Sequence, residues 1–159
     1  PRNRRGATPT SSPLPTREID MQFMIIRKAD AETEAGVMPG AELIAQMTQF
    51  HEDAAKLGIV IAGSGLMPSS RGAKVKFNGG RPTVIDGPFA EAKELIAGYT
   101  LIEVPSREAA IEWVKTWPKL DGHGNVEIEI RQLFTAEDFG EAYTDAMASR
   151  DAARNARSE

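Results

Sequence analysis

The run Asp-Gly-Pro-Phe at residues 86–89 is the part of the sequence whose residue types and spacing point most directly to chemistry. Asp86 stands where an expected strand ends and a Gly-Pro turn begins, and such a turn holds a carboxylate in a fixed place. Glu91, Lys93 and Glu94 follow closely along the chain. Two interpretations are open: a carboxylate that binds or reacts with a ligand, or an Asx-type turn followed by a solvated helical turn with an ion pair. The residues alone favour the second.

The two histidines are the other candidates for acid-base chemistry. His51 follows Met47 by four residues, which places it beside the apolar stripe of an expected helix. There it is either a general base or, more often, a packed histidine at the edge of the core. His123 lies in a glycine-flanked loop, where exposure is expected. Because two histidines and no cysteine make a tight transition-metal site in one subunit improbable, we predict no metal and no cofactor.

Charged residues alternate with apolar ones near the end of the expected sheet. Glu127, Glu129 and Arg131 occupy every second position there. In a lone domain they would form a solvated sheet face. In a paired domain they would line a cavity or bridge two copies, together with Tyr99 and Glu103 on the neighbouring strand.

Hydrophobic periodicity predicts the elements that position these residues. Strands are expected at residues 21–28, 59–67, 74–77, 83–86, 97–104 and 126–131, and helices at 43–57 and 107–117. Asn-Gly-Gly at residues 78–80 predicts a hairpin turn, while Ser106 and Thr135 are expected to cap the second helix and a C-terminal helix. Two strand-helix-strand units on one antiparallel sheet predict an α+β fold, a ferredoxin-like sandwich with an inserted hairpin and a C-terminal helix.

Several expected strands are apolar on both faces. In the first of them Phe23 and Ile25 face one way, and Met24 and Ile26 face the other. The helices of a ferredoxin-like sandwich cover only one face of its sheet, so the second apolar face requires another cover. We therefore expect a homodimer joined through its sheets.

Composition limits the remaining possibilities. The 159 residues fit one domain, which we expect at residues 21–139 between a flexible N-terminal tail at 1–20 and a C-terminal helix and tail at 140–159. The absence of cysteine removes disulfide scaffolds and thiolate chemistry and fits a cytoplasmic location. No apolar run approaches the length of a membrane span. The net charge is −4, with +2 in residues 1–20 and −6 in the remainder, so nucleic-acid binding is not expected.

The run DGPFAEAKELIAGY at residues 86–99 resembles the signature of the YCII-related family, specifically its DGPF branch. The resemblance extends over residues 21–139. It includes Gly-Leu-Met-Pro-Ser-Ser at 65–70, Gly-Gly at 79–80, Ser106 with Glu-Ala-Ala-Ile-Glu-Trp at 108–113, and Glu-Ile-Glu-Ile-Arg at 127–131. The resemblance implies a dimeric α/β barrel, in which paired sheets enclose a cavity.

The resemblance also implies a candidate site. A His–Asp pair has been suggested as the active site of related proteins, and the matching residues here are Asp86 and His51, with the aspartate orienting the imidazole as a general base. The residues expected around a ligand are Gly87, Pro88, Phe89, Glu91, Lys93, Tyr99 and Arg131.

Two functions follow as hypotheses. The first is a dimeric enzyme or binder of a small molecule, with its cavity near the turn at residues 86–89. The second is a non-enzymatic regulatory module that acts through protein contacts, since the sequence holds no complete catalytic constellation and relatives are associated with alternative sigma factors. Fold alone does not decide between them.

Overall fold

The computed structural model describes residues 20–155, so the expected tail at 1–20 lies almost entirely outside the described residues, as do residues 156–159. Its centre is a four-stranded antiparallel sheet in the order β2-β5-β1-β6. The strands are β1 (Met21–Lys28), β2 (Val60–Gly65), β5 (Ile96–Val104) and β6 (Ile128–Gln132). This order places one strand between the two strands of each β-α-β unit, the split β-α-β arrangement. The predicted α+β fold with an antiparallel sheet is confirmed.

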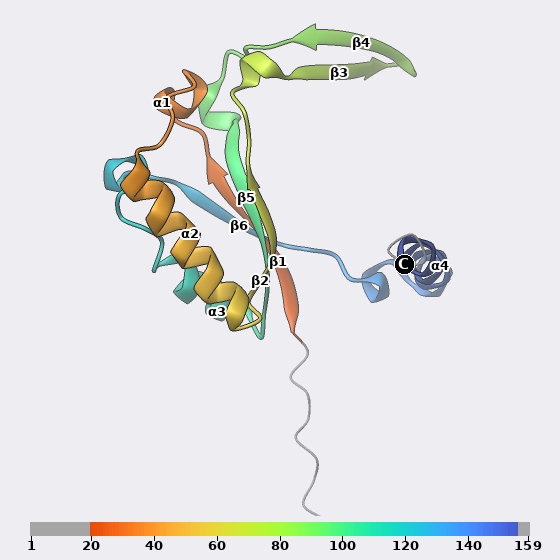
Figure 1. Ribbon diagram of the computed structural model, residues 1–159. Coiled ribbons are helices and arrows are strands. Elements are labelled where there is room, and N and C mark those ends of the chain that lie inside the picture. The colour runs from red at the N-terminus through yellow and green to blue at the C-terminus, as the bar shows by residue number, and fades with distance from the viewer. Residues whose placement is uncertain (1–19, 156–159) are drawn as a thin grey trace, which may run out of the picture.

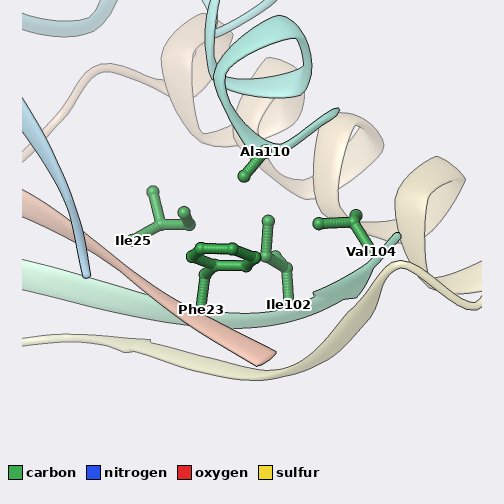
Figure 2. Packing of buried hydrophobic residues seen from close by; sticks show 5 residues of the cluster. All are labelled: Phe23, Ile25, Ile102, Val104 and Ala110. Carbon is green, nitrogen blue, oxygen red and sulfur yellow. The ribbon is translucent and has the colours of Figure 1, made fainter. Parts of the chain in front are cut away.

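Two helices, α2 (Ala41–Lys56) and α3 (Arg107–Val114), cover one face of this sheet (Figure 1). The core lies between them and the sheet, and Figure 2 shows its side chains converging from β1, β5 and α3. It consists of Phe23, Ile25, Ile102, Val104 and Ala110. Phe23 and Ile102 are register partners in β1 and β5, so both point to the helix side. Burial of each large side chain stabilises the fold by roughly 1.5–3 kcal/mol.

Local signals place the start of α3 and the end of α2. The Ser106 hydroxyl accepts a hydrogen bond from the Ala109 N–H at 3.1 Å, as expected of an N-cap. Gly58 follows the end of α2 with φ +73°, a conformation that glycine adopts without strain. One prediction is wrong: α3 ends at Val114, so Trp117 lies beyond the helix. Trp117 still packs on the core side, with its ring centroid 5.4 Å from that of Phe50.

The opposite face of the sheet, which we call the outer face, carries apolar side chains at its centre. Met24 pairs with Leu101 and Ile26 with Tyr99, and all four are half-buried in the single chain. The expectation of a sheet apolar on both faces is confirmed. Tyr99 and Glu103, however, do not lie on the strand next to β6, because β1 separates β5 from β6.

The inserted hairpin is formed by β3 (Ala73–Asn78) and β4 (Arg81–Asp86). The turn residues Gly79 and Gly80 have φ of +55° and +79°, the positive values that a two-residue hairpin turn requires. Every hairpin residue is exposed, and Figure 1 shows the ribbon projecting away from the four-stranded sheet.

The C-terminal region differs from its prediction. Thr135 begins a short 3₁₀ helix, η4 (Ala136–Phe139), and the long helix α4 (Glu141–Asn155) starts only after Gly140, which has φ +82°. α4 packs against η4 and stands away from the sheet (Figure 1). Within residues 20–155, no helix combines the length and apolarity that crossing a bilayer requires.

Candidate functional site

A buried serine joins three segments of the chain that are far apart in sequence. The Ser69 hydroxyl donates a hydrogen bond to Glu34 Oε2 at 2.5 Å, and the Ser69 N–H donates to Oε1 at 3.1 Å. The same hydroxyl oxygen accepts a hydrogen bond from the Phe89 N–H at 3.0 Å. Ser69 therefore links the short helix α1 (Ala31–Glu34), the turn after β2 and the turn at residues 86–89.

Helix α1, which hydrophobic periodicity did not predict, holds Glu34 in place. The Asp30 carboxylate accepts a hydrogen bond from the Thr33 N–H at 2.9 Å, and the Asp30 N–H donates to the Thr33 hydroxyl at 2.8 Å. This reciprocal pair is a capping box, which fixes the start of the helix. The Glu34 carboxylate is thus aimed at the Ser69 donors by its own helix.

The turn formed by residues 86–89, hereafter the Asp86–Phe89 turn, packs directly on the Ser69 backbone. The Gly87 N–H donates to the Gly72 carbonyl at 3.0 Å, and the Gly87–Pro88 peptide is cis. A Cβ atom built on Gly87 would overlap the Ser69 carbonyl oxygen. Only glycine therefore fits at this position of the motif.

A cavity of about 250 Å³ opens beside this turn. Its wall is mainly apolar and includes Leu66, Met67, Phe89, Leu95 and Ile96. Glu34 and Arg71 supply its charged groups. The Glu34 carboxylate is already bonded to Ser69, whereas the Arg71 guanidinium has no ion pair with any residue of the described chain. The cavity is suited to an apolar molecule that carries an anionic group.

The Phe89 ring, which forms part of the cavity wall, makes a cation–π contact with a lysine. Lys74 Nζ, on β3, lies 4.2 Å from the centroid of the Phe89 ring. At an exposed position such a cation–π contact contributes about 0.5–1 kcal/mol. It connects the base of the hairpin to the wall of the cavity.

A second cluster of charged groups lies at the other side of α1. The Arg27 side chain donates to Asp121 from Nε at 3.2 Å and from Nη2 at 2.7 Å, and Nη1 lies 2.9 Å from Asp30 Oδ2. Trp117 Nε1 adds a third hydrogen bond to Asp121 at 2.9 Å. Burial favours the neutral form of Arg27 and so acts to lower its pKa, but the hydrogen bonds and charges of Asp121 and Asp30 together raise it. Because each of these groups has partners, we regard the cluster as structural.

A hollow of about 400 Å³ adjoins this cluster and contains Lys93 among its lining residues. Lys28, Asp30 and Glu127 also line it, so its wall carries both signs of charge. Lys93 therefore belongs to this hollow rather than to the cavity beside Phe89. Within residues 20–155, no group of three or more histidine, aspartate or glutamate side chains is arranged to hold a metal ion.

His51 faces the sheet, as expected, but its bonded partners are not acidic. Its Nδ1 lies 2.8 Å from the Met47 carbonyl oxygen and its Nε2 3.0 Å from Thr100 Oγ1. Since a carbonyl only accepts, the neutral ring carries its proton on Nδ1 and accepts the Thr100 hydroxyl proton at Nε2. Asp86 is exposed at the end of β4, and no hydrogen bond or ion pair in the described chain joins it to His51. The catalytic pair stays a prediction.

The remaining predicted ligand residues are dispersed. Gly87, Pro88 and Phe89 form the turn beside the cavity, and Glu91 is exposed just after it. Tyr99 lies on the outer face in β5. Arg131 also lies there, in β6, and its Nη1 donates to Glu129 Oε1 at 3.0 Å.

Three residues that line the cavity were not identified from the sequence as ligand-binding or structural residues. They are Glu34, Ser69 and Arg71. Glu34 and Ser69 are separated by 35 positions, and no local pattern joins them. The available signal was the Asp-x-x-Thr spacing at Asp30 and Thr33, which is typical of a helix start. It would have identified α1 as a helix, although not its contact with Ser69.

Comparison with known proteins gives two matches. The model of the YCII-related domain matches residues 21–133 of this chain. An uncharacterized protein of Rhizobium meliloti (strain 1021) is 36% identical over 63 residues, which cover 40% of this chain and 48% of that protein. The chain thus spans about half the length of this curated relative.

Proposed function

The chain belongs to the YCII-related domain family, and from this premise we propose that it binds a small molecule in the cavity beside the Asp86–Phe89 turn. We also assign it to the DGPF branch of that family, because Gly87 and Phe89 of this motif build the turn and the cavity wall. The observation that carries the proposal is the cavity itself, with an apolar wall and a lining arginine, Arg71, that has no ion pair within residues 20–155.

The ligand class follows from the size and lining of the cavity. A volume of about 250 Å³ is slightly below the roughly 300–1,000 Å³ of pockets for drug-sized molecules. The apolar wall favours a compact hydrocarbon or aromatic body, and Arg71 favours a carboxylate, which a guanidinium binds with two parallel hydrogen bonds. The proposed ligand is therefore a small apolar carboxylic acid.

The test uses carboxylates that differ only in body and charge. Benzoate and hexanoate are titrated against the full chain by calorimetry, with benzamide as the neutral counterpart of benzoate. We expect saturable binding of at least one carboxylate, weaker binding of benzamide, and an affinity about tenfold or more lower in the Arg71→Ala variant. Arg107→Ala, which removes an exposed arginine on α3, is the matched control and should bind like the native chain.

Two results of this titration would refute the proposed ligand class. If neither carboxylate binds the native chain, or if Arg71→Ala and Arg107→Ala bind equally well, the proposed ligand class is wrong. A Phe89→Ala variant separates the two parts of the recognition, because it removes the aromatic side chain from the apolar wall and leaves the guanidinium. It should weaken the binding of both carboxylates, since each contacts this ring in the proposed complex.

We further propose that the protein acts as a homodimer, with the outer faces of two sheets packed together as in a dimeric α/β barrel. The support is the apolar centre of the outer face, formed by Met24, Ile26, Tyr99 and Leu101 and not covered by a helix within residues 20–155. An exposed apolar patch of this kind marks an interaction site. Sedimentation velocity at micromolar concentration should give the mass of two chains, and a single-chain mass would refute the dimer.

A further inference from the structure

The hairpin is a separate two-stranded sheet with one apolar and one basic face. Val75 pairs with Val84 and Phe77 with Pro82, so these four side chains share one face. In the single chain Phe77 is 71% exposed and Val84 is 64% exposed. An isolated two-stranded ribbon is at best marginally stable in water, whereas one that packs against a partner is stable. The apolar face of the hairpin therefore requires a cover.

The segment at residues 133–147, which we call the C-terminal arm, presents a second uncovered apolar surface. The ring centroids of Phe134 and Phe139 are 4.8 Å apart, and those of Phe139 and Tyr143 are 4.3 Å apart. Despite these contacts, Phe134 is 77% exposed and Phe139 is 48% exposed. Aromatic side chains of this kind contribute much of the energy of protein interfaces.

Both segments lie on the side of the sheet that the helices leave open. Figure 1 shows the hairpin and α4 projecting away from α2 and α3, on the side of the outer face. The hairpin follows β2 and the arm follows β6, which are the two opposite edges of the sheet. They also leave the sheet at opposite ends of its strands. The end of β2, before the hairpin, pairs with the start of β5. Gln132, before the arm, pairs with Phe23 near the start of β1, which lies beside the end of the antiparallel strand β5.

We propose that in the dimer the hairpin of each copy packs its apolar face on the aromatic side chains of the C-terminal arm of the other copy. This inference rests on the dimer of the proposed function. In one copy the hairpin and the arm leave from diagonally opposite corners of the sheet. A two-fold axis that lies between the two sheets, perpendicular to the line that joins these corners, places the hairpin corner of one copy over the arm corner of the other. It therefore brings each hairpin to an arm at both ends of one isologous interface.

The charges of the two surfaces are complementary. Lys74, Lys76 and Arg81 lie on the hairpin, opposite its apolar face, and their long side chains can reach around a two-stranded ribbon. The arm also carries exposed acidic side chains, namely Glu137, Asp138, Glu141 and Asp145. Opposite charges at the rim of an interface favour the correct partner and register. Within one chain no ion pair in the described part joins these two sets.

Cysteine cross-linking tests the contact, because the native chain has no cysteine of its own. Val84→Cys places a thiol on the apolar face of the hairpin, and Ala146→Cys places one in α4, three positions after Tyr143. We expect a disulfide-linked dimer when the two single variants are mixed and oxidised, and little cross-linking of either variant alone. Efficient linking of Val84→Cys to itself would show that hairpins meet hairpins, and would overturn the proposal.

A charge exchange provides a second test that does not depend on oxidation. The variant Lys76→Glu with Arg81→Glu, and the variant Glu137→Lys with Asp145→Lys, should each raise the dimer dissociation constant about tenfold or more, because like charges then face each other. An equimolar mixture of the two should restore association, since both contacts of the mixed dimer regain opposite charges. Lys56→Glu with Arg107→Glu, on the helix side, is the control for overall charge and should leave association unchanged.

The possible results distinguish this inference from the dimer on which it rests. A native chain that sediments as a monomer refutes both. A native dimer that gives no cross-link in the mixture, and no recovery on mixing the charge variants, refutes only the contact between hairpin and arm. That result would mean that the two surfaces receive other proteins.

Discussion

The buried Arg27–Asp121 pair shows how strongly a single residue can affect this fold. The two side chains are 10% and 12% exposed, and Asp121 accepts hydrogen bonds from both Arg27 and Trp117. Removal of Asp121 would leave the buried Arg27 with Asp30 as its remaining acidic partner and the Trp117 Nε1–H without its acceptor. Loss of a partner from a buried pair costs more than the intact pair contributes. The stability of the fold therefore depends on both partners being present.

Asp121→Ala should lower the free energy of unfolding by about 3–5 kcal/mol. Urea denaturation followed by tryptophan fluorescence measures the change. Glu108→Ala is the control, because its contact with Arg107 is 3.9 Å long and both side chains are exposed. The control should change stability by less than about 1 kcal/mol. Equal effects in the two variants would contradict the structural role of the cluster.

Acid should destabilise the protein through Asp30. Burial alone would raise the pKa of this carboxyl, but the Thr33 N–H hydrogen bond and the Arg27 guanidinium lower it below the ordinary 3.8. A carboxyl whose pKa is lower in the folded state contributes stability above 3.8, and this is lost as the pH falls through its folded pKa. Chemical denaturation from about pH 6 to pH 3 should show this fall, and Asp30→Asn should make it shallower.

If His51 has a packing role, its removal should lower the stability of the fold. His51→Ala would leave the Thr100 hydroxyl, on a residue 3% exposed, without its partner and would remove a ring from the Phe50–Trp113–Trp117 cluster. We expect a loss of about 2 kcal/mol of stability in urea denaturation. His123→Asn is the control, because its pair with Glu32 is exposed and should contribute little. An unchanged stability of His51→Ala would contradict the packed role.

At the scale of elements, the sequence predicted what local patterns determine. The bounds of β1, the glycine turn of the hairpin and the Ser106 cap all match, because each depends on residues within a few positions. The C-terminal end of α3 and the start of α4 do not match. Trp117 continues the helical spacing, yet it precedes Pro118, which disfavours helical backbone at the residue before it, and the helix ends at Val114. Gly140 interrupts the region after Thr135, and its positive φ separates η4 from α4.

The candidate site was predictable only in part for the same reason. The Asp86–Phe89 turn was recognised from its residue types, and Phe89 does line the cavity. Glu34, Ser69 and Arg71 come from two other segments, whose approach depends on strand order and on the path of the turn after β2. Lys93 lines the separate hollow and Arg131 lies on the outer face in β6, so the structure brings neither of them to Phe89, and their part in a ligand site stays a prediction.

Gly87→Ala tests whether the turn must lie against Ser69. The added Cβ would overlap the Ser69 carbonyl oxygen, which is backbone and cannot rotate away. We expect the turn to move, carboxylate binding to fall by about tenfold or more, and stability to drop by about 1–3 kcal/mol. Calorimetry and thermal unfolding measure both effects. Gly65→Ala is the matched control, because its Cβ would meet only the Ala97 carbonyl oxygen at 4.0 Å; an equally large loss there would contradict the role of close packing at Gly87.

At the scale of the whole molecule, three uncovered apolar surfaces share one side of the sheet. They are the centre of the outer face, the hairpin and the C-terminal arm. A chain of 159 residues can form an adequate core alone, so this side is not needed for the packing that α2 and α3 already provide. One partner placed over the outer face would cover all three surfaces together, whereas three separate partners would have to compete for adjacent space.

Leu101 lies at the centre of that side and gives the most direct test of it. It pairs with Met24 on β1 and Ala62 on β2, so its side chain points to the middle of the outer face. Leu101→Glu places a charge there, and burial of an unpaired carboxylate against the second copy would be strongly unfavourable. We expect a folded monomer in sedimentation velocity, with native circular dichroism, because the side chain is only half-buried in the single chain.

The matched control for Leu101→Glu is the same substitution at Leu57, which is 76% exposed just beyond the end of α2 on the helix side. Leu57→Glu should remain dimeric, since the helix side is not part of the proposed contact. If both variants stay dimeric, the copies do not meet through the outer face, and neither a shared barrel nor a contact between hairpin and arm follows. If only Leu101→Glu dissociates, carboxylate binding by that monomer shows whether the cavity beside the Asp86–Phe89 turn is complete in one chain, because every residue that lines it here comes from a single copy.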